Sequence, residues 1–406
     1  MGTSKPSQDI YYTTGCTLMN MVASATPKCY GFRGGVLTRI IAKEGGGKSF
    51  TASECVAHNH HKLPKFNHRY IDRETRYRFD TQKLYNMDII EAEERSPSTI
   101  AELEADLNSW LHHLKTPGVY VIDSLEAFSS DDVEERSEAR RVQYEKGKEV
   151  LIEDTMGMQA PKFLAQEFFK SVMETVAEKK VALLALSQVR ENIGGGKYSP
   201  KLKKTGGKST DHWVDTELWL QPVRDITVGT KGEKDFRKIG VVIECKASKS
   251  TGPWPYRTCY YSLYFEYGID NIGSNLDYLF DLRGKDHALL TSSNAIRWDQ
   301  GEPKTLVTMS AFMEEKGILD ECKAWFKETT GRSTIVKDTC DTWLSEHKVH
   351  GKEFSERFAS EVYSRDELIK KIEETPEMEK ELEQRVIAKW EGFEAAATPN
   401  RRSKFG

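Results

Sequence analysis

The residues of this chain with the clearest chemical pattern form a short glycine-rich turn that ends in a lysine and a hydroxyl side chain. The turn reads Glu44-Gly45-Gly46-Gly47-Lys48-Ser49-Phe50, and it follows the apolar run 36–41. Glycines let backbone N–H groups approach phosphate oxygens, a lysine can contact β and γ phosphates, and a serine hydroxyl can ligate Mg²⁺. We therefore interpret residues 44–50 as a nucleotide phosphate loop, with Lys48 and Ser49 in these two roles.

One position departs from the strict phosphate-loop pattern G-x-x-x-x-G-K-[ST]. Ala42 stands where that pattern has glycine, so the loop must close without that residue. A Gly-Lys-Ser segment is also common in ordinary loops. The nucleotide hypothesis therefore depends on other residues of the same site.

Two acidic residues follow apolar runs, as a nucleotide site requires. Asp123 ends the run 119–122, and in a parallel α/β sheet an acid at this point can support the metal bound by Ser49. Glu74 follows the run 68–72 and is the candidate for orienting the attacking water. The alternative readings are a helix N-cap for Asp123 and a solvated surface charge for Glu74.

A fourth apolar run, 181–187, ends at Gln188 and leads into a basic segment. The amide of Gln188 could hydrogen-bond a γ phosphate and so respond to the state of the nucleotide. Between residues 192 and 210 there are five lysines and no acid. A flexible basic loop with apolar residues suits single-stranded nucleic acid, because the charges follow phosphates and the side chains use exposed base faces. A solvated loop is the alternative.

The ordered set of motifs resembles the RecA family of DNA recombinases, nearer to the phage UvsX type than to the bacterial one. The resemblance covers roughly residues 11 to 295 and is carried by the phosphate loop and by four further segments: 14–20 with 34–40, 154–160, 188–194 and 206–220. It implies a RecA-like P-loop NTPase core of α/β class, with a mainly parallel central sheet flanked by helices.

By the same resemblance, the chain would be a DNA-dependent ATPase that uses ATP and Mg²⁺. It would assemble as a helical filament on single-stranded DNA and pair that strand with homologous duplex DNA, with single-strand-binding and loader proteins as further partners. Lys246 or Lys249 would reach the nucleotide of the adjacent subunit, and Tyr77 or Phe79 would contact adenine. The implied DNA contacts are Met156, Lys162, Arg190, Ile193, Lys197, Tyr198, Lys201, Lys203, Lys204 and Lys208.

One departure from the family pattern leaves other functions open. The family carries an amino-terminal helix and strand that dock on the neighbouring subunit, whereas here the core is expected to begin near Tyr11. Head-to-tail interfaces close into rings as well as extend into helices, so a hexameric helicase-type or KaiC-like motor is one alternative. A nucleotide-binding recombination regulator that does not form filaments is another, and Ala42 is its support.

The composition limits the class of protein. The chain has 406 residues, a formal net charge of -4 and seven cysteines without a C-x-x-C pair, which favours reduced thiols over a disulfide framework. A nucleic-acid-binding protein without overall basicity must concentrate its positive charge locally. Neither a signal peptide nor an apolar run of membrane length is evident, so we expect an intracellular, cytoplasmic protein, in the host cell if it is phage-encoded.

The order of the predicted elements favours a parallel sheet, because strands alternate with helices. Strands are expected at 36–41, 68–72, 118–123 and 181–187, and helices at 48–58, 99–115 and 161–178. Segments 238–244 and 257–264 alternate like antiparallel or edge strands. The expected domains are a short segment 1–12, the ATPase core 13–298 with DNA loops at about 129–162 and 189–210, a helical domain 299–396 and a disordered tail 397–406.

Overall fold

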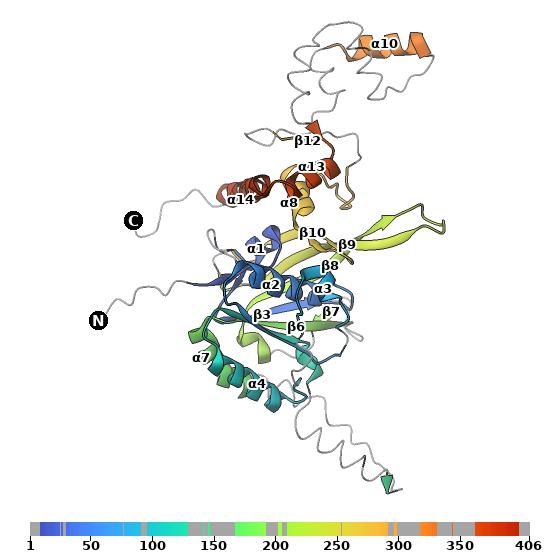
Figure 1. Ribbon diagram of the computed structural model, residues 1–406. Helices are drawn as coiled ribbons and strands as arrows, with labels where there is room; N and C mark the ends of the chain where they lie inside the picture. The colour runs from blue at the N-terminus through green and yellow to red at the C-terminus, as the bar shows by residue number, and fades with distance from the viewer. Residues whose placement is uncertain are drawn as a thin grey trace, which may run out of the picture. The chain divides into compact units, whose positions relative to one another are not determined.

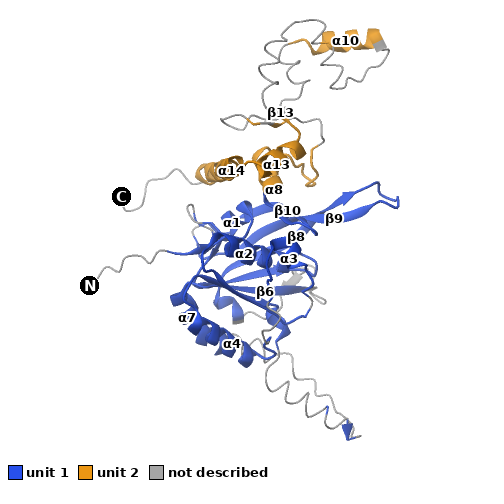
Figure 2. Ribbon diagram, in the orientation of Figure 1, with its two compact units in different colours: residues 1–271 blue, residues 272–406 orange. Residues whose placement is uncertain are grey.

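The computed structural model describes residues 9–24, 26, 30–75, 77–90, 96–128, 141, 145–146, 167–191, 202–204, 209–252, 254–290, 296–298, 317–330, 343 and 362–397. The chain divides into two units, Met1–Asn271 and Ile272–Gly406 (Figure 2). The division falls earlier than the boundary expected after residue 298.

The first unit is built on one mixed β-sheet with the strand order β11-β10-β9-β8-β3-β6-β5-β4 (Figure 1). Neighbouring strands from β8 to β4 run parallel, and the remaining pairs of the path are antiparallel. The parallel strands are β3 (Val36–Ala42), β4 (Asn67–Asp72), β5 (Gly118–Asp123), β6 (Ala182–Glu191) and β8 (Val214–Val228). The antiparallel part consists of β9 (Arg237–Lys249), β10 (Thr258–Tyr264) and β11 (Gly268–Asp270), and β7 (Leu202–Lys204) pairs with β6. A mainly parallel core of this kind is compatible with Rossmann-like and P-loop-like α/β folds.

Helices flank this sheet, and their ends follow from local sequence. The helices of this unit are α1 (Thr17–Ser24), α2 (Lys48–Lys62), α3 (Thr81–Tyr85), α4 (Ile100–His113) and α7 (Phe169–Lys179). Thr99 caps α4, since its hydroxyl accepts a hydrogen bond from the backbone N–H of Glu102. The remaining elements are the short strands β1 (Tyr11–Tyr12) and β2 (Phe32–Arg33) and the 3-10 turns η1 (Leu125–Ala127) and η3 (Ser209–His212). No helix in the described part of the chain is long and apolar enough to cross a membrane.

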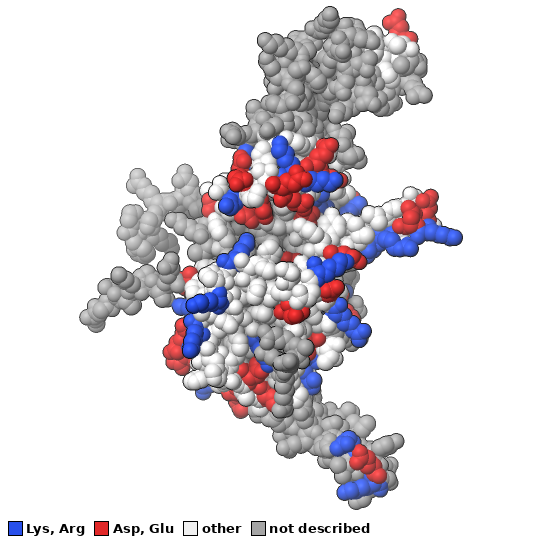
Figure 3. All heavy atoms as spheres, viewed as in Figure 1, with Lys and Arg blue, Asp and Glu red and all other residues white. Residues whose placement is uncertain are grey.

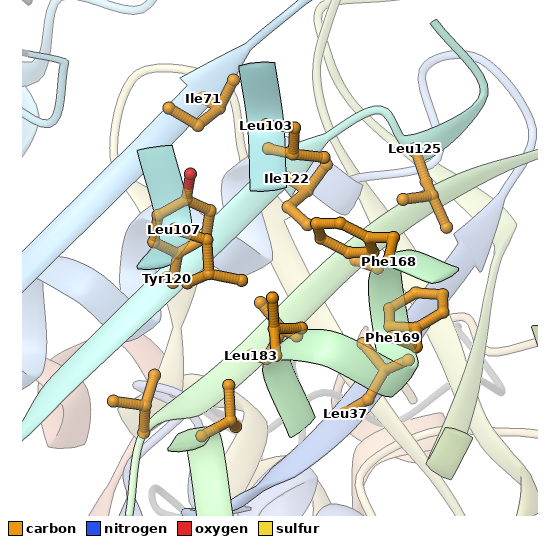
Figure 4. Close-up of a cluster of buried hydrophobic side chains, with 14 of the residues drawn as sticks. Leu37, Ile71, Leu103, Leu107, Tyr120, Ile122, Leu125, Phe168, Phe169 and Leu183 are labelled. Carbon is orange, nitrogen blue, oxygen red and sulfur yellow. The ribbon is translucent and has the colours of Figure 1, made fainter. Parts of the chain in front are cut away.

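A hydrophobic core lies between the sheet and the helices α4 and α7 (Figure 4). Leu103, Leu107 and Leu111 recur along α4 at helical spacing, and all three are fully buried. They belong to the same cluster as Tyr120 of β5 and Phe168, which precedes α7. Their burial holds the strands whose carboxyl ends carry the candidate site.

The outer halves of β8 and β9 form a two-stranded ribbon that projects from the sheet (Figure 1). β8 pairs with β3 only up to Leu220, and β9 pairs with β10 only from Gly240 onward. Beyond these points the two strands pair with each other. Figure 3 shows basic and acidic side chains together on this ribbon. The turn between β8 and β9 contains Lys231, Glu233 and Lys234, all exposed.

The described parts of the second unit are mainly helical. Its elements are α8 (Asn271–Leu279), β12 (Ile296–Arg297), α10 (Leu319–Thr330), β13 (Val362–Tyr363), α13 (Arg365–Glu373) and α14 (Pro376–Ala397). A capping box begins α13, since the side chains of Ser364 and Glu367 accept hydrogen bonds from each other's backbone N–H. Leu382, Val386 and Trp390 are buried along one face of α14, so this face belongs to the core of the unit.

Buried charges explain why this unit begins at α8. The buried carboxylate of Asp277 in α8 forms two ion pairs. Its Oδ2 lies 2.6 Å from Nη2 of Arg283, and its Oδ1 lies 2.6 Å from Nε of Arg365. These contacts join residues on both sides of the expected boundary after residue 298. The segment before that boundary therefore packs with the carboxy-terminal helices.

Candidate nucleotide site

The glycine-rich turn lies between the end of β3 at Ala42 and the start of α2 at Lys48. Gly47 is the N-cap of α2 and has a φ of 88°, a left-handed conformation that favours glycine. The first N–H groups of α2 have no partner within the helix, and together with the helix dipole they favour an anion at this end. A loop followed by a helix N-terminus is suited to holding phosphate groups.

The structure explains how the turn closes with alanine at position 42. A Cβ placed on Gly46 would lie 2.6 Å from the Cβ of Ala42 and 2.9 Å from the carbonyl oxygen of Lys43. Real Cβ atoms do not approach each other so closely. The methyl group of Ala42 therefore occupies space that the missing side chain of Gly46 leaves, and the two residues are complementary.

Lys48 is buried at the start of α2, with a relative exposure of 8%. Its amine lies 3.5 Å from the carbonyl oxygen of Ala42 and 3.4 Å from that of Lys43. Burial lowers the pKa of Lys48, and the nearby carboxylates of Asp123 and Glu74 oppose that shift. An anionic phosphate in the turn would favour the charged amine in the same way.

The carboxyl ends of β4, β5, β6 and β3 meet at one edge of the sheet, as parallel neighbours must. The register pairs Asp72 with Asp123 between β4 and β5, and Gln188 with Ala42 between β6 and β3. The polar residues predicted from three separate strand ends are therefore brought to the same edge as the phosphate loop.

Asp123 is bonded directly to the hydroxyl that follows the loop lysine. The Oγ of Ser49 donates to Oδ2 of Asp123 at 2.7 Å, and the hydroxyl of Tyr70 donates to the same oxygen at 2.8 Å. Burial raises the pKa of Asp123, and these two hydrogen bonds oppose the shift. Within the described residues no hydrogen bond reaches its other oxygen, Oδ1. Asp123 and Ser49 thus lie side by side, and their role in holding a metal stays a prediction.

Glu74 and Gln188 also meet, although 114 positions separate them in the chain. The side-chain amide of Gln188 donates to Oε1 of Glu74 at 2.7 Å, and the hydroxyl of Ser124 donates to the same oxygen at 2.5 Å. The solvated-charge reading of Glu74 does not describe this arrangement, since its carboxylate is held by the ends of β5 and β6. Within the described residues, Oε2 of Glu74 receives no hydrogen bond.

The residues considered for adenine contact lie in an aromatic cluster beside α2. The ring of Tyr77 is 5.1 Å from that of Tyr70 and 5.0 Å from that of Phe79, and Phe79 lies 4.1 Å from Phe50. The hydroxyl of Tyr77 is 2.6 Å from the Oγ of Ser53. Adenine contact by Tyr77 or Phe79 stays a prediction.

Lys246 and Lys249 differ in their surroundings. The amine of Lys249 donates to the backbone oxygen of Asp211 at 2.6 Å, within the same chain. The side chain of Lys246 is exposed. A role in the neighbouring subunit stays a prediction for both, and the hydrogen bond of Lys249 makes Lys246 the more accessible of the two.

Gln188 lies on β6, which continues to Glu191 and leads directly into the basic segment. β7 returns beside it, with Lys204 opposite Val189 and Lys203 opposite Arg190 in the backbone register. Of the predicted DNA contacts, Met156, Lys162, Ile193, Lys197, Tyr198, Lys201 and Lys208 lie outside the described residues. Gln188 therefore lies both at the candidate nucleotide site, where it bonds Glu74, and on the strand that leads into the basic segment.

Sequence reasoning missed Arg39, a buried charge on β3. Its side chain is 2% exposed, and its Nε donates to Oε2 of Glu217 at 3.0 Å. It also pairs with Asp211 and donates to the hydroxyl of Thr210 at 3.1 Å, both in η3. An arginine within an apolar strand was a visible signal, since a buried charge requires partners.

Two hydroxyl residues of the site were also missed. Ser124 follows the predicted metal-supporting Asp123, and Tyr70 lies two positions before the end of β4. Their roles depend on pairings between strands, which local sequence does not display. No protein-family model matches the chain, and no curated protein matches it.

Proposed function

We propose that the chain is an ATP-dependent DNA recombinase of the RecA family. It binds ATP with Mg²⁺, assembles on single-stranded DNA, and pairs that strand with homologous duplex. The observation that carries this proposal is the hydrogen bond between Gln188 and Glu74, because it connects the residue expected to activate water to the strand that leads into the basic segment.

The residues of the turn suit Mg²⁺·ATP. The hydroxyl of Ser49 and the carboxylate of Asp123 are hard oxygen donors, which Mg²⁺ prefers, and they are already 2.7 Å apart. Bound Mg²⁺ would neutralise charge on the β and γ phosphates. The N-terminus of α2 and Lys48 would hold the phosphates themselves.

Glu74 is proposed to orient the attacking water. Its Oε1 is fixed by Ser124 and Gln188, which leaves Oε2 as an acceptor for a water proton. A carboxylate held at one oxygen keeps a defined orientation, and positioning of this kind is a large part of phosphoryl-transfer catalysis.

Gln188 is proposed to couple the nucleotide to DNA. A γ phosphate would compete with Glu74 for the Gln188 amide, and a shift of that side chain would act on β6 and its partner β7. The basic residues Arg190, Lys203 and Lys204 lie on these strands. ATP binding would thereby change the presentation of the DNA-binding segment.

The direct test combines two measurements on the full chain. We expect ATP hydrolysis to rise with single-stranded DNA, and the affinity for fluorescent single-stranded DNA to rise with a non-hydrolysable ATP analogue. Gln188→Ala should bind the analogue normally but lose most of the nucleotide-dependent gain in DNA affinity. Nucleotide binding with no DNA response in the wild type would instead favour a nucleotide-binding regulator.

A further inference from the structure

The hydroxyl of Tyr70 is aimed at the oxygen of Asp123 that also receives Ser49. Tyr70 lies on β4 and is 4% exposed, and its hydroxyl donates to Oδ2 at 2.8 Å. The Ser49 hydroxyl donates to Oδ2 at 2.7 Å. A carboxylate oxygen has two lone pairs in the carboxylate plane, and two donors on one oxygen restrict rotation of the whole group.

The surroundings fix the position of the Tyr70 ring. Tyr77 packs against it with ring centroids 5.1 Å apart, and the hydroxyl of Tyr77 is bonded to Ser53 of α2. The Oγ of Ser53 donates in turn to the backbone oxygen of Ser49 at 2.8 Å. The Tyr70 ring on β4 is therefore linked through Tyr77 and Ser53 to α2, the element that also carries Ser49.

From this geometry we infer that Tyr70 is a positioning residue, whose hydroxyl holds Asp123 in the orientation that supports the divalent cation bound with the nucleotide. With Oδ2 held by Tyr70 and Ser49, Oδ1 remains to accept from a water of that cation. The inference rests on the proposed nucleotide site. Hydrogen-bond partners of metal-supporting carboxylates commonly change metal affinity by about 10- to 100-fold when removed.

The variant Tyr70→Phe tests this role, because it removes one hydroxyl and keeps the ring. Tyr120→Phe is a matched control on the adjacent strand: Tyr120 is also buried, and its hydroxyl donates to a carboxylate outside the site, Oδ1 of Asp106, at 2.6 Å. Both variants lose a buried hydroxyl bonded to an acid. Only Tyr70→Phe loses a hydrogen bond to Asp123.

Two quantities are measured for the full-length wild type and both variants. The first is the affinity for Mn²⁺ in the presence of a non-hydrolysable ATP analogue, from the electron paramagnetic resonance signal of free Mn²⁺. The second is the affinity for the analogue in EDTA, by calorimetry. A purely structural role for Tyr70 would change both quantities or neither.

We expect Tyr70→Phe to weaken Mn²⁺ binding about tenfold or more and to leave the affinity in EDTA within about twofold of the wild type. Tyr120→Phe should match the wild type in both measurements. Unchanged Mn²⁺ affinity in Tyr70→Phe, or an equal loss in Tyr120→Phe, would overturn the inference and leave the nucleotide site standing. Failure of the wild type to bind the analogue at all would overturn the proposed function together with the inference.

Discussion

At the scale of single residues, the site consists of two carboxylates that are held in different ways. Asp123 receives two hydroxyl donors on one oxygen, whereas Glu74 receives a hydroxyl and an amide. In both, the second oxygen receives no hydrogen bond within the described residues, and the proposed roles differ because Asp123 is bonded to Ser49 whereas Glu74 is bonded to Gln188. Their separate partners allow the two roles to be tested independently.

Replacement of Glu74 by glutamine should separate binding from hydrolysis. Glu74→Gln keeps the size of the side chain but removes the base, so we expect ATP affinity within about threefold of the wild type and hydrolysis reduced by about 10²- to 10⁴-fold. The complex with single-stranded DNA and ATP should persist correspondingly longer. Steady-state hydrolysis and DNA dissociation kinetics measure the two effects.

The control for this variant is Glu174→Gln on the exposed surface of α7, which makes the same chemical change away from the site. It should leave both rates unchanged. Full hydrolysis by Glu74→Gln would remove Glu74 from the proposed mechanism.

Asp123→Asn should stabilise the fold while abolishing hydrolysis, and the gain in stability should depend on pH. Burial raises the pKa of Asp123 above its ordinary value of 3.8, so ionisation destabilises the folded chain. This cost in folding free energy is absent at pH values below 3.8, the ordinary pKa. It grows as the pH rises toward the raised pKa of Asp123, and it is complete at pH values above that pKa. Asparagine can accept the same hydrogen bonds without the charge.

We therefore expect Asp123→Asn to have a higher Tm than the wild type at pH 7, and the difference to shrink as pH falls toward 4. Mg²⁺-dependent hydrolysis should be lost. Thermal denaturation across this pH range measures the effect, and a lower Tm at pH 7 would show that the charged carboxylate stabilises the fold.

At the scale of elements, the turn and strand β3 connect the candidate nucleotide site to the segment that follows the basic loop. Arg39 on β3 reaches Glu217 on β8 and Asp211 in η3, while Ser248 on β9 donates to Oε1 of Glu217 at 2.7 Å. This network links β3, β8, β9 and η3. It ties the return of the basic loop to the sheet.

Removal of Arg39 should be strongly destabilising because it leaves Glu217 buried without its cation. We expect Arg39→Met to reduce the free energy of unfolding by about 3–5 kcal/mol, and the added change Glu217→Gln to restore part of that loss. Urea denaturation measures both. Arg141→Met, which breaks the exposed pair with Glu145, should cost less than about 1 kcal/mol.

The charge on β7 should contribute to DNA affinity in a salt-dependent way. Lys203→Gln with Lys204→Gln removes two positive charges opposite Arg190 and Val189. For single strands the slope of log affinity against log salt falls by about 0.7 per lost phosphate contact, so we expect a slope smaller by about 1.4. Fluorescence anisotropy at several salt concentrations measures it.

The matched control is Lys231→Gln with Lys234→Gln, which removes two lysines from the exposed turn of the β8–β9 ribbon. This pair should leave the slope unchanged. Equal slopes for both double variants and the wild type would show that β7 does not contact the DNA backbone.

Much of the fold at this scale could be predicted from sequence. Apolar runs gave the strands β3, β4, β5 and the start of β6 to within one or two residues, because buried parallel strands are continuous in hydrophobicity. The extension of β6 to Glu191 could not be predicted, since it depends on pairing with β7. Helix α2 also runs beyond the predicted end at His58, to Lys62.

In the candidate site, too, some residues could be predicted from the sequence and others could not. Lys48, Ser49, Asp123, Glu74 and Gln188 were recognisable because each follows an apolar run and parallel strands end at one edge. Tyr70 and Ser124 act through neighbours that only the register brings together. The complementarity of Ala42 and Gly46 likewise depends on the folded turn, and a strict motif would have rejected it.

At the scale of the whole molecule, the proposed function requires subunits to assemble on DNA in response to ATP. The chain has a net charge of -4, so the proposed affinity for DNA would have to come from local basic segments rather than from overall charge. The exposed Lys246 is a candidate for acting on the nucleotide of a neighbouring subunit, as a charge that stabilises phosphoryl transfer across an interface. The proposed role of Lys246 requires a neighbouring subunit.

The most direct measurement is electron microscopy of the full-length protein with single-stranded DNA and a non-hydrolysable ATP analogue, beside samples that lack either component. We expect helical filaments that form only when both the DNA and the analogue are present. Closed rings would contradict the recombinase and favour a hexameric motor, and the absence of any assembly would contradict both.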